Sequence, residues 1–320
     1  MVAVSIVIPT FKRTDKLIRL LKSISESSKI FDDIEIIIVN DDPEVKYDET
    51  QFKDIISKEV TIINNYKNFG VNISRYIGAK NSSGKYILFI DDDNVVSQNM
   101  IYNLYLDFEE LDSSVAALAP VAYYYSAKDK VWWCGSRFDR LTLRAYTIKS
   151  CDGKFIETDD VHNAFMIRKE HLKYMELTLK YFKRTFSTFS FMTLLKNNGL
   201  KALVDTSAVI YHDAPYDVDK GREITLSELI KVRFDEDRIY HFFYEPIVYA
   251  KFFSKSYTLL LFRIIAQFVR LNYYSLAIIR SKIPLSKKFS LMRYAYAGYI
   301  KGILTKLDTE SSRNHLLYNK

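Results

Sequence analysis

The stretch from Lys85 to Asn94 constrains the fold of this chain more than any other. Tyr86 to Ile90 is a run of five apolar residues, typical of a strand buried on both faces of a parallel sheet. Asp91, Asp92 and Asp93 follow directly. Three carboxylates cannot stay inside a sheet, so we expect them at the C-terminal edge of the strand, where open α/β sheets bind ligands. An exposed acidic turn would have the same sequence, so neighbouring segments must decide between the two.

Strand and helix signals alternate along the first hundred residues. Apolar runs predict strands at residues 2–8, 34–39 and 60–63, ahead of the run at 86–90. Helical spacing predicts a helix that begins at Thr14 and another that includes Arg75. The alternation predicts an α/β fold with a mostly parallel sheet and right-handed crossovers. Because the second strand ends in Asp41, two acidic strand ends meet at one edge, and this favours a binding site over an exposed turn.

Four segments, in this order, resemble the family 2 glycosyltransferases, which have the GT-A fold. They are residues 4–13, 37–42, 68–78 and 84–93. The resemblance continues more weakly to about residue 213 and is closest to the rhamnosyltransferase-like branch that builds polysaccharides or lipid-linked glycans. It implies an inverting hexosyl or deoxyhexosyl transferase that uses a UDP-, GDP- or dTDP-sugar and a divalent metal, Mn²⁺ or Mg²⁺. The acceptor implied is a glycan or a polyprenyl-linked molecule.

The resemblance also assigns site residues by position. Those at the nucleotide sugar would be Pro9, Thr10, Arg13, Asp41, Arg75, Asp91 and Asp92, with Asp41 at the base. The metal would be held by Asp91, Asp93 and His212. A cation that bridges diphosphate oxygens would neutralise charge as the bond between sugar and oxygen breaks. Taken singly, Arg13 and Arg75 are equally consistent with exposed helix faces, and His212 with a structural role.

The general base of the family is missing from its usual place. The family carries Glu-Asp-x-Asp at the start of a helix before a glycine, and counting back from Gly199 these positions are Ser187 to Ser190. Hydroxyl groups cannot deprotonate an acceptor near neutral pH. Three explanations stay open. Asp159 or Asp160 acts as the base, or the acceptor is a phosphate that needs none, or the chain is a nucleotide- or glycan-binding pseudo-glycosyltransferase.

The last ninety residues differ in charge from the rest. Residues 231–320 contain sixteen Lys or Arg and six Asp or Glu, whereas the whole chain has a net charge of +7. We expect a catalytic domain at residues 1–230 and a basic, aromatic-rich helical region at 231–320 that contacts an anionic membrane surface. Arg263, Gln267 and Arg270 would form a polar stripe facing the headgroups. The alternative is a helix packed on the catalytic domain with its arginines in solvent. The basic region contains no nucleic-acid-binding module, so we expect no nucleic acid partner.

Three further features concern the compartment. Cys134 and Cys151 have neither metal-ligand spacing nor a disulfide framework, so we expect both to be reduced. Residues 1–8 are too short and lack the charge of a signal peptide. The longest uncharged run between residues 239 and 279 is nine residues, too short to span a membrane. These features predict a cytoplasmic protein, peripheral at the inner face of the membrane.

Overall fold

The computed structural model describes residues 2–307, which divide into two compact units. The sheet unit contains the residues up to 137, 147–179 and 191–214; the helical unit contains 138–146, 180–190 and the residues from 215 onward. The domain boundary expected between residues 230 and 231 stays a prediction. Residues 308–320 of the expected C-terminal region lie outside the described residues.

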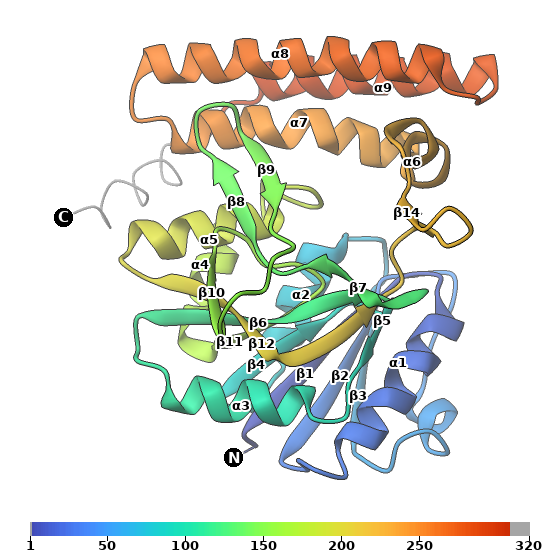
Figure 1. Ribbon diagram of the computed structural model, residues 1–320, viewed down its shortest axis with the longest axis vertical. Helices are drawn as coiled ribbons and strands as arrows, with labels where there is room; N and C mark the ends of the chain where they lie inside the picture. The colour runs from blue at the N-terminus through green and yellow to red at the C-terminus, as the bar shows by residue number, and fades with distance from the viewer. Residues whose placement is uncertain (1, 308–320) are drawn as a thin grey trace. The chain divides into compact units, whose positions relative to one another are not determined.

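The parallel half of the central sheet is built from the strands that the apolar runs predict. They are β1 (Val4–Thr10), β2 (Ile34–Asn40), β3 (Val60–Asn64) and β4 (Tyr86–Ile90). Their order is β4-β1-β2-β3, with every neighbouring pair parallel and Ile6 opposite both Ile36 and Leu88. All residues of β1 and β4 are buried, which explains the uninterrupted apolar run of β4 and the mostly apolar sequence of β1, where Ser5 and Thr10 are the polar residues. The predicted α/β fold with a mostly parallel central sheet is confirmed (Figure 1).

The connections between these strands are mainly helical. They are α1 (Thr14–Ser27), the 3-10 turn η1 (Glu49–Phe52) and α2 (Val71–Lys80), and α3 (Met100–Glu110) follows β4. Helix α2 packs closely on the sheet because residue 78 is glycine. A Cβ atom at Gly78 would lie 2.4 Å from Cγ1 of Val7 in β1. The small residue therefore fixes the depth of the helix that contains Arg75.

Antiparallel pairing extends the sheet beyond β4. Strand β11 (Ala164–Arg168) lies antiparallel between β4 and β6 (Val115–Tyr124), and β12 (Lys201–His212) runs parallel to β6. Short strand β5 (Asn94–Val96) pairs with β12 and places His212 opposite Asn94. The C-terminal end of β12 is thereby held beside the acidic run. The remaining elements of the middle segment are β7 (Ala127–Trp133), β8 (Ser136–Asp139), β9 (Arg144–Thr147), β10 (Phe155–Thr158), η2 (Lys169–His171), α4 (Leu172–Glu176) and α5 (Ser187–Asn197).

The prediction that both cysteines are reduced is wrong, because Cys134 and Cys151 form a disulfide in the structure. The backbone brings them together: Cys134 N–H donates to Ile148 O, and Ile148 N–H donates to Gly135 O, both at 2.8 Å. The two Cα atoms are 5.9 Å apart, within the range that a disulfide spans. This pairing also removes the cysteine argument for an intracellular location.

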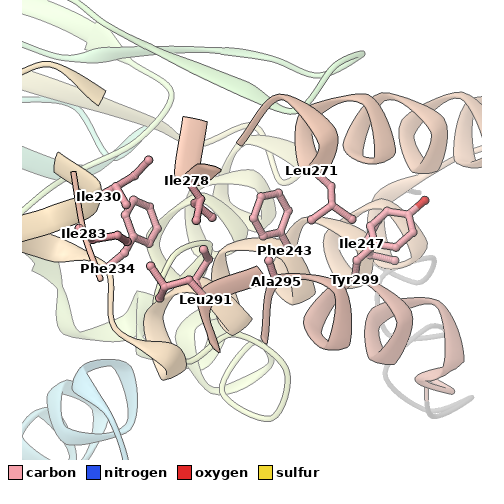
Figure 2. Packing of buried hydrophobic residues seen from close by; sticks show 11 residues of the cluster. Ile230, Phe234, Phe243, Ile247, Leu271, Ile278, Ile283, Leu291, Ala295 and Tyr299 are labelled. Atoms are coloured by element: carbon pink, nitrogen blue, oxygen red, sulfur yellow. The ribbon is translucent and has the colours of Figure 1, made fainter. Parts of the chain in front are cut away.

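The helical unit is a group of helices around an apolar core. Hairpin β13 (Tyr216–Asp217) and β14 (Arg222–Glu223) precedes α6 (Leu226–Arg233), α7 (Glu236–Phe253), α8 (Tyr257–Arg280) and α9 (Leu285–Leu304). The last three run side by side (Figure 1). Figure 2 shows the core between them, where Phe243, Leu271 and Ala295 come from three different helices. Gly298 of α9 lets α7 approach, since a Cβ there would lie 2.2 Å from Tyr240 O.

The expected orientation of the polar stripe on α8 is wrong. Arg263 and Gln267 are buried, at 4% and 1% exposure, and contact backbone carbonyl groups instead of solvent. Arg270 stacks on Phe242, with its guanidinium carbon 4.1 Å from the ring centroid. Hydropathy periodicity shows that a stripe exists but not which side faces inward. Among residues 2–307, no helix combines the length and the apolar character needed to cross a membrane.

Candidate active site

The acidic run emerges from β4 and is held at both ends by backbone hydrogen bonds. Asp91 N–H donates to Asn163 O at 2.7 Å, and Asp213 N–H donates to Asp93 O at 3.0 Å. Asn163 has a φ of 47°, a conformation that asparagine tolerates better than most residues. The C-terminal ends of β4 and β12 and the N-terminal end of β11, which is antiparallel to β4, therefore meet at the acidic run.

The last residue of β1 and a residue just after this strand also contact the acidic run. The Thr10 hydroxyl donates to Asp92 at 2.8 Å, and Pro9 directly precedes it in the same strand. Arg13 donates from one nitrogen to both Asp92, at 3.0 Å, and Asp93, at 2.8 Å. Thr10 and Arg13 thus contact the acidic run, and their expected place at the nucleotide sugar stays a prediction. Arg13 is 41% exposed in its side chain, so one face of the guanidinium is still available to a ligand.

Arg75 is a buried partner of the acidic run. It lies in α2, is 4% exposed, and pairs through Nη2 with Asp91. The interpretation of Arg75 as an exposed helix residue is therefore wrong. A buried arginine is strongly destabilising unless an opposite charge pairs with it. Arg75 and Asp91 therefore fix each other's positions.

Asp41 supports the same helix from the preceding loop. Its carboxylate accepts hydrogen bonds from Asn65 Nδ2 at 2.8 Å, Phe69 N–H at 2.9 Å and Gly70 N–H at 2.7 Å. Gly70 is the residue immediately before α2. Asp41 therefore holds the N-terminus of the helix that carries Arg75, a role that its strand-end position did not predict. Its predicted contact with a nucleotide base stays a prediction.

The surroundings of Asp92 and Asp93 shift the pKa values of these two carboxylates in opposite directions. Burial outweighs Arg13 and raises the pKa of Asp92 to about 6. Burial acts in the same direction on Asp93, but His212 and Arg13 outweigh it and hold the pKa of Asp93 well below its usual range. Asp93 is therefore ionised at neutral pH, where it pairs with Arg13.

The chemistry of the predicted metal ligands suits a divalent cation. Nδ1 of His212 is buried, has no hydrogen-bond partner among residues 2–307, and lies 3.5 Å from Asp93 Oδ1. A carboxylate beside an unpaired imidazole nitrogen is a donor set that Mn²⁺ accepts. No three His, Cys, Asp or Glu side chains within the described chain are grouped closely enough to form a ready metal site. Arg13 and Arg75 occupy the carboxylates of Asp93 and Asp91 instead.

The two candidate bases have different surroundings. Asp159 pairs with Lys196 of α5 at 2.7 Å. Asp160 is fully buried, and its Oδ2 lies 3.4 Å from Nδ1 of His162. Burial, together with His212 and Arg75, lowers the pKa of His162, so this imidazole is neutral at neutral pH. The structure thus places beside Asp160 a histidine that sequence reasoning missed.

Aromatic rings connect that histidine to His212. The ring centroid of Trp132 lies 5.9 Å from His162 and 4.4 Å from His212, and Trp133 lies 5.3 Å from His162. A single histidine forms no periodic pattern that would indicate a role. The sequence showed only that His162 lies two residues after Asp160 and just before a buried strand. The Trp pair was recognisable as a cluster, but its histidine contacts depend on tertiary structure.

The residues at the start of α5, where the family carries its base, have hydroxyl and aromatic side chains. Ser187 and Ser190 are buried, at 3% and 0% exposure. The loop just before α5 contacts an acidic group, Glu245, which accepts hydrogen bonds from the backbone N–H groups of residues 183–186 at 2.7–2.9 Å. Those four donors engage both oxygens, so Glu245 is a structural cap for this loop rather than a substitute base.

Comparison with known proteins gives one family and a consistent fold. The family model described as Glycosyl transferase family 2 matches residues 5–175. An uncharacterized glycosyltransferase of Haemophilus influenzae is 33% identical over 90 residues, which are 28% of this chain and 29% of that protein. The minor teichoic acid biosynthesis protein GgaB of Bacillus subtilis is 24% identical over 172 residues, which are 50% of this chain and 18% of that protein. The chain covers less than a third of the length of either relative.

The fold is similar to that of a solved structure of GalNAc-T7 with UDP, GalNAc and Mn²⁺. The TM-score is 0.56 at 15% sequence identity, over 86% of this chain and 57% of that one. At this identity the similarity concerns the fold, and it agrees with the GT-A architecture expected from the sequence.

Proposed function

Since the chain belongs to glycosyltransferase family 2, we propose that it is a metal-dependent, inverting enzyme that transfers a sugar from a nucleotide-sugar donor. The observation that carries the proposal is the convergence of Thr10, Arg13, Arg75 and His212 on the acidic run Asp91–Asp93. Sugar transfer from a nucleoside diphosphate produces a charged leaving group. This group needs cations and hydrogen-bond donors fixed in advance, and the convergence supplies both.

In this proposal the two arginines change partners when the donor binds. Arg13 and Arg75 neutralise the carboxylates while no ligand is bound, and each can donate hydrogen bonds to phosphate oxygens instead. Asp91, Asp93 and His212 would hold the divalent cation, which stabilises the negative charge of the diphosphate. Pro9 and Thr10 would border the nucleotide, Asp41 would bind its base, and Asp92 would lie nearest the ribose.

For the acceptor hydroxyl, we propose that Asp160 orients His162 and that His162 Nε2 accepts the proton. The neutral imidazole has a lone pair for the proton. The carboxylate of Asp160, 3.4 Å from Nδ1, would stabilise the charged ring that forms and so offset the lowered pKa of His162. Asp159 contributes less, because Lys196 already pairs with it. A phosphate acceptor, which needs no strong base, is the second possibility. A pseudo-glycosyltransferase that binds a nucleotide or glycan without turnover is the third.

The donor and acceptor classes rest on relatives and on charge. The GalNAc-T7 structure contains UDP, GalNAc and Mn²⁺, and GgaB is named for minor teichoic acid biosynthesis. We propose a UDP-, GDP- or dTDP-sugar as donor. The acceptor would be a glycan or polyprenyl-linked molecule, met by a cytoplasmic enzyme at the inner face of the membrane. The rhamnosyltransferase-like specificity stays part of this proposal.

The test is a panel of UDP, GDP and dTDP sugars with Mn²⁺ or Mg²⁺, read by thermal stabilisation and by donor hydrolysis. We expect one nucleotide to stabilise the protein only with metal, and Asp93→Asn to lose this effect. Asp129→Asn, an exposed aspartate of β7, is the matched control and should retain it. Stabilisation without hydrolysis or transfer would favour the pseudoenzyme, and no stabilisation by any nucleotide would overturn the proposal.

The base assignment has its own test. Asp160→Asn and His162→Gln should each lower transfer to a hydroxyl acceptor by about 100-fold or more, while donor binding stays unchanged. Asp159→Asn should have a small effect. If transfer survives in both Asp160→Asn and His162→Gln, the acceptor is activated without this pair.

A further inference from the structure

Helix α8 is oriented with its polar side toward the protein. Arg263 donates from Nε and Nη2 to the carbonyl oxygen of Arg140, at 2.9 and 2.6 Å, and Gln267 donates from Nε2 to that of Thr142 at 2.9 Å. Both carbonyls lie in the turn between β8 and β9, within the same helical unit. Three directed hydrogen bonds therefore fix the rotation of α8 about its axis.

The opposite side of α8 is apolar and exposed. It carries Leu261, Ile265, Phe268, Val269, Tyr273 and Leu276, which are 47–65% exposed. Only Asn272 interrupts this face with an exposed polar group between residues 261 and 279, and no charged side chain lies on it. Helix α9 adds Leu285 and Phe289, at 67% and 61% exposure. Contiguous apolar surface on this scale marks a binding surface in a folded protein.

The charge around this face identifies its partner. Residues 246–307 contain eleven Lys or Arg and no Asp or Glu. Arg280, Lys282, Arg293 and Lys301 are exposed in the same two helices and the turn between them. A second copy of this face would bring like charges together, whereas an anionic lipid surface supplies the opposite charge and an apolar interior.

We propose that the exposed face of α8, with the adjoining residues of α9, binds an anionic bilayer as an interfacial helix pair. The apolar residues insert among the acyl chains, the basic residues contact lipid phosphates, and Arg263 and Gln267 anchor the helix to its own protein. This inference deepens the proposed function, since it names the surface on which the enzyme would meet a lipid-linked acceptor. It reverses the lipid-facing role expected for the arginine stripe.

The experiment is flotation of the full chain with phosphatidylglycerol-containing or pure phosphatidylcholine vesicles. We expect binding to the anionic vesicles only, and Ile265→Gln/Val269→Gln should weaken it at least about tenfold, because that pair loses apolar area without a change in charge. The matched control is Tyr102→Gln/Leu106→Gln, two partly exposed residues of α3, which should bind as the unmodified chain does.

A second measurement reports insertion directly. Tyr273→Trp should show fluorescence quenching by lipids brominated in the acyl chain, whereas a tryptophan that replaces Tyr102 should not. Equal binding to neutral vesicles would overturn the charge argument. A dimer in light scattering that is lost in Ile265→Gln/Val269→Gln would overturn the bilayer in favour of a second copy.

Donor binding separates this inference from the proposed function. If vesicle binding fails while a nucleotide still stabilises the protein with Mn²⁺, only the membrane surface is wrong. If vesicle binding persists and no nucleotide binds, the proposed catalytic function is wrong and the surface stands.

Discussion

Individual buried charged side chains in this protein are paired with an opposite charge or with hydrogen-bond donors. Arg75 pairs with Asp91, Asp41 accepts two backbone N–H groups and an amide, and Glu245 accepts four backbone N–H groups. An unpaired charge at any of these places would cost several kcal/mol, so each pairing determines a local conformation. The carboxylates thereby position loops and helix ends as well as any ligand.

Glu245→Gln is expected to lower the free energy of unfolding by about 2–4 kcal/mol, because an amide offers one oxygen where four N–H groups need acceptors. Urea denaturation measures the change. Glu236→Gln, in the same helix and exposed, is the control and should change stability by less than about 0.5 kcal/mol. Equal effects of the two substitutions would mean that the cap around Glu245 contributes nothing.

The free energy of unfolding should also decrease as the pH rises, because of His241. Burial lowers its pKa, but Asp237 and Glu245 outweigh burial and raise the pKa of His241 to about 9. Between pH about 6.5 and about 9, the folded protein holds a proton that the unfolded chain has released, so folding weakens as pH rises through this window. The loss should be at most about 3 kcal/mol. Urea unfolding at both ends of the window measures it, and His241→Asn should remove this part of the slope; an unchanged slope would exclude His241 as its origin.

At the scale of elements, close packing between helices depends on glycines. Gly298→Val should destabilise the protein by about 2–4 kcal/mol, because the new side chain meets the backbone of Tyr240 in α7. Ala297→Val adds the same side chain at the adjacent, exposed position and should cost about 1 kcal/mol or less. Thermal unfolding of both variants tests this, and similar melting temperatures would show that α7 and α9 can move apart without cost.

The elements that the sequence predicted well are those whose signal is local. Strand β4 was predicted with its observed bounds, because five apolar residues lie between a glycine turn and three carboxylates. The parallel order of the strands predicted that the ends of β2 and β4 lie at one edge of the sheet, but not that Thr10 and Arg13 bind the carboxylates of Asp92 and Asp93. The contacts of His162 and the direction of the α8 stripe depend on residues far away in sequence, so no local pattern contained them. The disulfide required knowledge of the turn that brings Ile148 to Cys134.

At the scale of the whole molecule, the helical unit includes two short segments, residues 138–146 and 180–190, that interrupt the sheet unit in the sequence. Phe138 and Phe182 belong to the helical unit, although a segment of the sheet unit follows each of them in the sequence. Their ring centroids lie 5.5 Å from that of Tyr249 and 6.2 Å from that of Phe252, respectively. A composition shift near residue 230 marks a change in charge, but it does not reveal these two segments.

A chain that ends at residue 230 should therefore aggregate or unfold without cooperativity, because Phe138 and Phe182 lose their partners in α7. A chain that ends at residue 307 keeps every contact described here and serves as the control. Size-exclusion chromatography and thermal unfolding distinguish the two. A monodisperse, cooperatively unfolding chain of residues 1–230 would instead support the domain boundary expected from the sequence.

The reversed orientation of α8 changes which substitutions evolution can accept there. Its polar positions, Arg263 and Gln267, are fixed by geometry, whereas Ile265 and Val269 need only stay apolar. Scoring schemes that treat hydrophobic positions as the invariant core would rank these sites in the wrong order. In homologues of this helix we therefore expect two conserved polar residues one turn apart, while the apolar residues around them vary in identity.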